Sequence, residues 1–265
     1  MAIKTTKPAT VEEVEEESIA YYDDTNHDYQ DFWIGRDYEH NAEVIALRKL
    51  LNGKRYKLAM DYGGGYGRIS PVILEFADRL ILVDPSIKQL DIAKGFLKDY
   101  PEVEYQKITK SDYLPAKDNS IDLVVMVRVS HHLPHPEKTF KEISRVLKPG
   151  GQAIIEVANE AHFVNRIKYL KKLQGVPKEP VPIGEKANGK EEDTPFFNHN
   201  PATIAAQLQA SNLTTLNKLS VSNLRQAYLK EHLSLKRMLA IEKFFQGKLS
   251  YLDFGPSIFF LVSKL

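Results

Sequence analysis

The sequence contains no cysteine, and this absence excludes several kinds of site at once. Disulfide bonds, thiolate metal sites and cysteine nucleophiles all require that residue. No apolar run approaches the roughly 18 residues that a membrane-spanning helix needs. Residues 1–18 are polar and carry an acidic run from Glu12 to Glu17, so they lack the apolar core of a signal peptide. We therefore expect a cytoplasmic protein without stable membrane insertion.

An excess of charge of one sign is also missing. There are 36 lysines and arginines against 35 aspartates and glutamates, which gives a formal net charge of +1. Proteins that bind nucleic acid or anionic membranes over a wide surface carry a basic excess. We therefore expect a small molecule as the main partner, with RNA or protein as the alternatives. The composition carries no signal for the oligomeric state.

What the sequence does have is enough apolar material for one large core. Its 265 residues are 43% hydrophobic and 27% charged, which is typical of a globular domain. We expect residues 1–18 to form a flexible tail and residues 19–265 to form a single domain. Within that domain, residues 52–158 carry a regular pattern, about 160–200 form an insert, and 201–265 complete the fold.

The regular pattern alternates short apolar runs with helical segments. Residues 121–127 give the strongest strand signal, because they are β-branched and almost wholly apolar. Apolar strands alternating with helices indicate an α/β fold, with a parallel sheet covered by helices on both faces. The predicted strands are 57–60, 80–83, 103–106, 121–127 and 152–157, and the helices between them are 68–77, 86–98 and 136–147.

The flanking segments have a different character. Residues 43–51 space their apolar side chains as one helix face, in an N-terminal segment rich in aromatic residues. After the fifth strand we predict a basic amphipathic helix over 161–173 and a long mobile loop over 175–200. A helix over 201–210, a strand over 213–221, a long helix over 224–245 and a buried strand over 257–263 follow.

The turn after the first predicted strand is the main candidate for a ligand site. An acid, Asp61, precedes alternating glycines, Gly63, Gly65 and Gly67. Glycine permits a tight turn and lets a ligand approach the main chain, and the following helix offers free N–H groups. The alternative is a purely structural turn. The spacing differs from the G-x-G-x-x-G of dinucleotide sites, and it suits a cofactor with an amino-acid tail better than a pyrophosphate.

A second acid, Asp84, ends the second predicted strand. An acid about 20 residues beyond the glycine turn can accept both hydroxyls of a ribose. The alternative is a helix N-cap, for which both Asp and Ser are preferred. We expect Ser86 to be the cap and Asp84 to be free. An acid at this position indicates an unmodified ribose, as in NAD or S-adenosylmethionine.

Together these residues closely resemble the class I S-adenosylmethionine-dependent methyltransferases. The resemblance covers residues 56–157, because five motifs follow in the family's order on the expected elements. They are the acid and alternating glycines at 61–67, Val83-Asp84-Pro85-Ser86, Ser111-Asp112-Tyr113-Leu114-Pro115, Ser130-His131-His132-Leu133, and Arg145-Val146-Leu147-Lys148-Pro149-Gly150-Gly151. The resemblance implies a Rossmann-like, doubly wound sheet of seven mainly parallel strands and S-adenosylmethionine as the cofactor.

The resemblance also implies roles for particular residues. Asp61 and the turn backbone would hold the methionine part of the cofactor, and Asp84 would bind the ribose. Asp112 would contact the adenine amino group with Tyr113 beside the ring. Arg128 and Val129 would lie near the sulfonium or the methionine carboxylate. The full cofactor-binding set is Asp61, Tyr62, Gly63, Gly64, Gly65, Gly67, Asp84, Pro85, Ser86, Asp112, Tyr113, Arg128 and Val129. The sequence departs from the family at Gly64, often Cys or Ser, and at Tyr66, often Thr or Ser.

Two histidines after the fourth strand have two interpretations. His131 or His132 could act as a general base, since imidazole titrates near neutrality. The alternative, which we favour, is that they cap or pack against the following helix. We expect no metal site here, because no matching carboxylate pair accompanies them.

The expected reaction is direct displacement of a methyl group from a sulfonium onto an O, N or C nucleophile, which needs no obligatory catalytic dyad. Substrate choice should reside in the N-terminal aromatics and the 160–200 insert. Tyr21, Tyr22, Phe32 and Trp33 could form a lid, although packing is the expected role for most of them. The basic helix could touch a membrane or RNA, but we expect a solvated helix face. The competing functions are an NAD-dependent oxidoreductase and a non-catalytic partner subunit that binds the cofactor.

Overall fold

The computed structural model describes residue 23 and residues 29–183, 186–187, 190–191 and 196–265. The predicted flexible tail and the lid candidates Tyr21 and Tyr22 lie outside the described residues. Among the described helices, none is both long and apolar enough to cross a bilayer.

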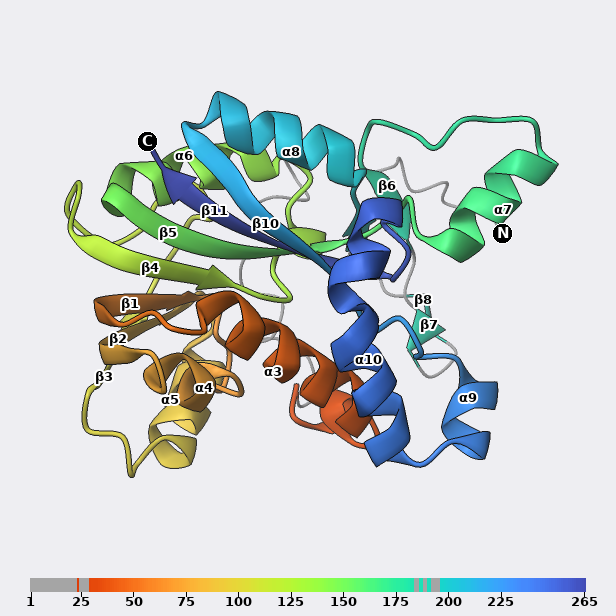
Figure 1. The fold of residues 1–265 in the computed structure, drawn as a ribbon. Coiled ribbons are helices and arrows are strands. Elements are labelled where there is room, and N and C mark those ends of the chain that lie inside the picture. The colour runs from red at the N-terminus through yellow and green to blue at the C-terminus, as the bar shows by residue number, and fades with distance from the viewer. Residues whose placement is uncertain (1–22, 24–28, 184–185, 188–189, 192–195) are drawn as a thin grey trace, which may run out of the picture.

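A seven-stranded sheet runs through the molecule in the order β10-β11-β5-β4-β1-β2-β3 (Figure 1). Six strands run parallel, and β11 lies antiparallel between β10 and β5. The predicted fold class and mainly parallel sheet are confirmed. The strands are β1 Tyr56–Tyr62, β2 Ala77–Asp84, β3 Val103–Lys107, β4 Ile121–Met126, β5 Leu147–Ala158, β10 Leu213–Val221 and β11 Ser257–Lys264.

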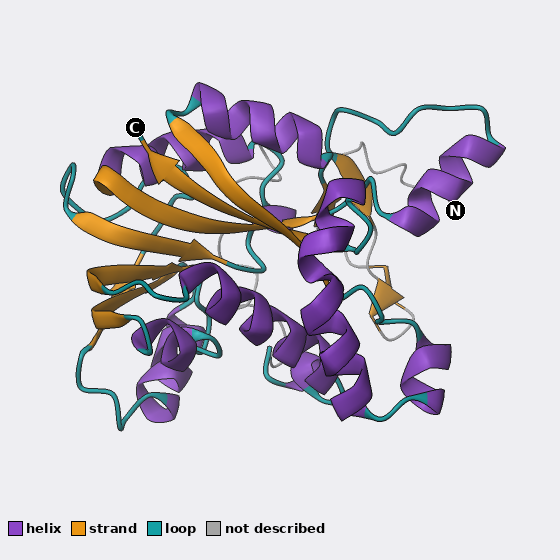
Figure 2. Cartoon of the chain, viewed as in Figure 1, coloured by secondary structure: helices purple, strands orange, loops and turns teal. Residues whose placement is uncertain are grey.

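Helices cover both faces of this sheet (Figure 2). One face packs against α3 Asp37–Leu51, α4 Ser70–Leu74, α5 Ile87–Phe96 and α10 Leu235–Leu249. The other face packs against α6 Pro136–Val146 and α8 Pro201–Ala210. Neighbouring residues of β4 face opposite ways, so Val125 enters the first core and Val124 the second. Burial on both sides is the reason that the central strands are mainly apolar.

Three predicted elements differ from the structure. The helix predicted over 68–77 is shorter, because β2 already begins at Ala77. The long helix predicted over 224–245 is two helices, α9 Ala227–His232 and α10, because Leu233 and Ser234 are extended (ψ 135° and 147°). Serine at an N-cap position favours the start of a new helix there.

The predicted loop over 175–200 was also wrong in part. It contains β6 Val181–Ile183 paired antiparallel with β9 Phe196–Asn198, and the short pair β7 Lys186–Ala187 and β8 Lys190–Glu191. Phe196 and Phe197 are both buried. Removal of these two adjacent aromatic side chains from water favours the formation of β9.

The adjacent phenylalanines of β11 provide a test of the two-sided core. Phe259 belongs to one core cluster and Phe260 to the other, and both are at most 1% exposed. We expect Phe259→Ala and Phe260→Ala each to lower the free energy of unfolding by about 3–5 kcal/mol. The exposed Phe244 of α10 is the control, with an expected loss of about 1 kcal/mol or less for Phe244→Ala. Urea unfolding measures all three; a small loss at either core position would contradict burial on that face.

Candidate functional site

A cavity opens where β1, β2 and β4 end. Ligands of doubly wound sheets bind at this carboxyl edge. Most of the predicted site residues meet there, although they are distant in the sequence. Those that line the cavity are Tyr62, Gly63, Gly65, Asp84, Pro85, Ser86, Arg128, Val129 and His132.

The glycine turn forms one wall. Gly63 and Gly65 have φ of +68° and +55°, a conformation that L side chains rarely adopt. A Cβ on Gly63 would lie 2.4 Å from the Val129 side chain. The other two predicted glycines do not border the cavity. A Cβ on Gly64 would meet the Asp61 carboxyl at 2.8 Å, and one on Gly67 would meet Leu97 at 2.5 Å, so these two serve packing.

Asp84 joins the glycine turn to helix α5. One carboxylate oxygen accepts a hydrogen bond from the Gly65 N–H (2.8 Å) and the other from the Ser86 N–H (2.9 Å). Ser86 caps α5 by accepting from the Gln89 N–H (3.1 Å), as predicted. Burial raises the pKa of Asp84 to about 6. Each carboxylate oxygen retains capacity for a further hydrogen bond from a ligand hydroxyl.

Asp61 lies behind the turn rather than at the wall. It is 1% exposed and accepts a hydrogen bond from the Ser70 hydroxyl (2.7 Å). Burial raises its pKa to about 7. Its contact with Gly64 means that Asp61 supports the shape of the turn from inside.

Arg128 lines the cavity and forms an ion pair that the sequence analysis did not predict. Its Nε donates to Glu43 of α3 (2.7 Å), and Arg68 pairs with the other Glu43 oxygen (2.6 Å). Although burial acts to raise the pKa of Glu43, the two guanidiniums outweigh it and hold that pKa below its usual value. Arg128 has φ of +63°, and its N–H donates to Glu156 (3.0 Å). The sequence placed Arg128 near the sulfonium or the methionine carboxylate of the cofactor, and the structure shows its Nε paired with Glu43.

The two residues predicted to contact the adenine, Asp112 and Tyr113, do not line the cavity. Tyr113 is 57% exposed and Asp112 is also exposed, and the wall is formed by Ile108 and Ser111 instead. The Ser111 carbonyl accepts a hydrogen bond from the Tyr62 hydroxyl (2.9 Å). Because this carbonyl is held inward and Leu114 is buried, the two residues between them face solvent.

The two histidines have different positions. His132 borders the cavity and His131 does not. Both rings pack edge-on against Phe196, at 5.0 and 5.3 Å between centroids. Burial lowers the pKa of His132 to about 4 and that of His131 well below its usual value, so both rings are neutral near pH 7. Within the described ranges, no group of three or more His, Asp or Glu side chains is arranged to hold a metal ion.

The N-terminal aromatic residues cover the glycine turn. Tyr29 borders the cavity and lies 3.3 Å from a Cβ built on Gly65. Phe32 and Trp33 pack against Tyr29, and the Arg68 guanidinium lies 3.5 Å from the Trp33 ring centroid. Phe32 and Trp33 are therefore packing residues, and Tyr29 is the aromatic residue at the wall that the sequence did not single out.

Gln89 is a further residue that sequence reasoning missed. It is 1% exposed and borders the cavity, yet neither atom of its side-chain amide has a hydrogen-bond partner among the described residues. A buried unpaired amide is costly unless a ligand satisfies it. The available signal was a polar residue beside Leu90 and Ala93 on the buried face of α5.

The fold and the site together define the class of domain to which this structure corresponds. A parallel sheet with a glycine turn after β1 and a buried acid ending β2, both at one cavity, is a Rossmann-like nucleoside-binding domain. Residues 60–155 match the model of the methyltransferase domain family. The resemblance to the S-adenosylmethionine-dependent methyltransferases is thereby confirmed.

Individual relatives agree with this assignment. An uncharacterised methyltransferase from Mycobacteroides abscessus is 29% identical over 133 residues, which are 50% of this chain and 46% of the relative. A ubiquinone biosynthesis O-methyltransferase from Dechloromonas aromatica is 29% identical over 110 residues, 41% of this chain and 46% of the relative. The chain thus matches about half the length of these curated relatives.

A solved structure has the same fold. It is a S-adenosylmethionine-dependent methyltransferase, a possible histamine N-methyltransferase, from Thermotoga maritima. The TM-score is 0.58 at 20% identity, over 89% of this chain and 94% of that chain.

The raised pKa of Asp84 predicts a pH dependence of cofactor binding. An ionised carboxylate is the better acceptor for ribose hydroxyls, and Asp84 takes up a proton below pH about 6. Affinity for S-adenosylhomocysteine should therefore rise with pH, by about tenfold between pH 5 and pH 7. Calorimetric titration of Asp84→Asn should show affinity weaker by about 1–3 kcal/mol at pH 7 and this dependence removed. If the affinity of Asp84→Asn depended on pH as strongly as that of the unchanged protein, the titrating group would be Asp61 instead.

Gln89 predicts opposite effects on binding and stability. Gln89→Leu should weaken S-adenosylhomocysteine binding by about 0.5–1.5 kcal/mol, because a hydrogen-bond partner of the ligand is lost. The free protein should be at least as stable as before, because an unpaired buried amide is removed. Gln207→Leu on α8, away from the cavity, is the control for binding. Unchanged affinity in Gln89→Leu would show that the amide does not face the ligand.

Proposed function

We propose that this chain transfers a methyl group from S-adenosylmethionine to a small-molecule acceptor by direct displacement. The observation that carries the proposal is the Asp84 carboxylate bonded to the Gly65 N–H at the wall of a cavity, within a domain of the methyltransferase family. This pair brings together a carboxylate that would accept the ribose hydroxyls and the glycine turn, which supports a site for a sulfonium nucleoside.

The residues at the wall fit that cofactor. Asp84 would accept the ribose hydroxyls, and the unpaired amide of Gln89 offers both a donor and an acceptor beside it. Gly63 and Gly65 leave room for the amino-acid tail where any Cβ would intrude or be strained. Ile108 and Leu133 supply apolar wall for the base.

When bound, the cofactor supplies a methyl group already activated by its sulfonium. The chain's own residues then have to align the acceptor and exclude water, which contributes on the order of 7–11 kcal/mol to such reactions. Tyr29 and Val129 are placed to keep water out. His132 is neutral near pH 7 and could accept a hydrogen bond from an acceptor hydroxyl or amine at this wall.

A small acceptor suits the names of two compared proteins. One is named for ubiquinone biosynthesis and the other as a possible histamine N-methyltransferase. A non-catalytic subunit that binds the cofactor is the second candidate. An NAD-dependent oxidoreductase is disfavoured, because the compared proteins are methyltransferases.

Transfer of labelled methyl groups tests the proposal. The protein is incubated with labelled S-adenosylmethionine and a cell extract divided into metabolite, nuclease-treated and protease-treated fractions. We expect label in the metabolite fraction and much less with Asp84→Asn. Label confined to a nuclease- or protease-sensitive product would refute the small acceptor. Cofactor binding without transfer to any fraction would support the non-catalytic subunit.

A further inference from the structure

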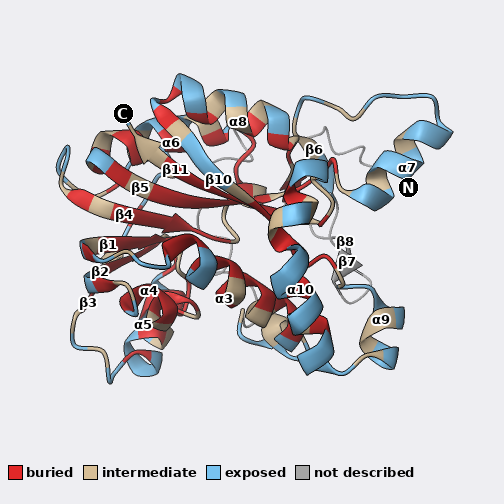
Figure 3. Ribbon diagram, viewed as in Figure 1, coloured by how far each residue is buried: buried red, intermediate tan, exposed pale blue. Residues whose placement is uncertain are grey.

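Helix α7, Phe163–Lys171, stands apart from the layers that form the core. It follows β5 at the edge of the sheet where the cavity opens, and no residue of α7 is buried. Figure 1 shows it projecting from the body of the molecule, and Figure 3 shows mostly exposed residues along it. The helix therefore contributes little to the core.

The apolar residues of α7 are turned to solvent. Leu170 is 72% exposed, and Val164 and Ile167 are each 38% exposed. In an amphipathic surface helix these positions normally face the core. Here the opposite side faces the protein, because Tyr169 donates to Glu160 (2.5 Å) and Arg166 lies 3.7 Å from the Asp253 carboxylate.

Leucine also occupies the end of the helix where glycine is favoured. Leu173 has φ of +53°, and its N–H and that of Gln174 close the last turn by donating to Leu170 and Tyr169. L side chains other than Asn and Asp are disfavoured in this conformation. Nevertheless the position carries a leucine that is 92% exposed. An exposed apolar residue at a strained position has no benefit for the fold of the described chain.

The charge beside this apolar face is of one sign. Residues 161–178 contain no aspartate or glutamate, and Lys168, Lys171 and Lys172 have no acidic partner among the described residues. The whole chain is nearly neutral, so this cationic segment is a local feature.

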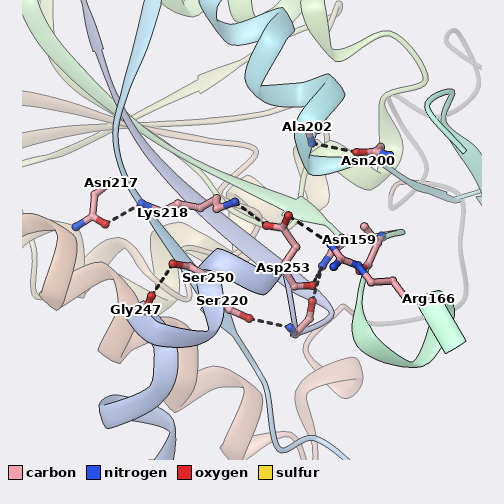
Figure 4. A network of polar contacts seen from close by, with 12 residues as sticks. Asn159, Arg166, Asn200, Ala202, Asn217, Lys218, Ser220, Gly247, Ser250 and Asp253 are labelled. Carbon is pink, nitrogen blue, oxygen red and sulfur yellow. Dashed lines mark hydrogen bonds and ion pairs between the residues drawn. The ribbon is translucent and has the colours of Figure 1, made fainter. Parts of the chain in front are cut away.

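The base of α7 is held firmly (Figure 4). The Asn159 amide donates to the carbonyls of Asp253 and Gly255, both at 2.7 Å, and Lys218 pairs with the Asp253 carboxylate at 2.7 Å. Phe163 stacks on Phe254 with 5.0 Å between centroids. The anchored base presents the apolar and cationic face in a fixed orientation.

We propose that α7 docks this protein on an anionic lipid bilayer, with Ile167, Leu170 and Leu173 in the interface and the lysines at the headgroups. Exposed leucines flanked by lysines, without acids, match the composition of interfacial helices. RNA binding would use the lysines but would leave the leucines unexplained. The sequence-based expectation of a solvated face does not account for Leu173. This inference is independent of the proposed function.

Sedimentation with vesicles tests the proposal on the full chain. We expect binding to phosphatidylcholine vesicles that contain about a quarter phosphatidylglycerol, weak binding to phosphatidylcholine alone, and weakening by high salt. Leu170→Glu combined with Leu173→Glu should lower the partition coefficient by about tenfold or more. Lys171→Glu combined with Lys172→Glu should lower binding to the anionic vesicles only.

Matched changes at exposed positions of another helix are the controls. Phe244→Glu, and Lys236→Glu combined with Lys243→Glu, alter exposed positions of α10 and should leave vesicle binding unchanged. Thermal unfolding checks that every variant remains folded. No binding to anionic vesicles, or equal binding by the double leucine variant, would overturn the proposal. So would RNA binding that depends on the α7 lysines and not on the leucines.

Discussion

The buried carboxylate of Glu43 fixes the surroundings of the cavity. It lies between Arg128, which follows β4, and Arg68, which follows the glycine turn, and it belongs to α3. Removing one partner of a buried ion pair leaves an uncompensated charge and costs about 3–5 kcal/mol. Three segments that are far apart in the sequence are therefore held in one geometry. Helix α3 thereby helps to position Arg128 at the cavity wall.

Asp84 continues this connection on the other side of the cavity. Its two oxygens hold the Gly65 and Ser86 N–H groups, so the glycine turn and the start of α5 cannot move independently. A site arranged in advance needs little reorganisation when a ligand binds. The strained backbone of Arg128 is consistent with this, because its N–H bond to Glu156 and its pairing with Glu43 maintain a conformation that the residue alone would not favour.

The sequence predicted the sheet well, because strands buried on both faces carry runs of consecutive apolar residues, as at Val124 and Val125. It also located Asp84 and the glycine turn, whose chemistry is local. The sequence did not predict contacts between distant segments, such as the pair of Glu43 and Arg128, which are 85 positions apart. Local signals also do not reveal which residues of a loop the backbone turns toward solvent. Asp112 and Tyr113 turn outward because the neighbouring Ser111 carbonyl is held inward by Tyr62. The break between α9 and α10 depends on two extended residues within an otherwise helical pattern.

The position of β11 has a consequence for the order in which the chain can assemble. This strand follows all the others in the sequence, yet it lies inside the sheet, between β5 and β10. During synthesis one edge of β5 stays unpaired until β11 has been made. Until then β10 also has no neighbouring strand in the sheet. Exposed strand edges are sites of mispairing with other chains. Completion of the sheet is therefore a late, long-range event, and a nascent chain at this stage is the form most exposed to aggregation.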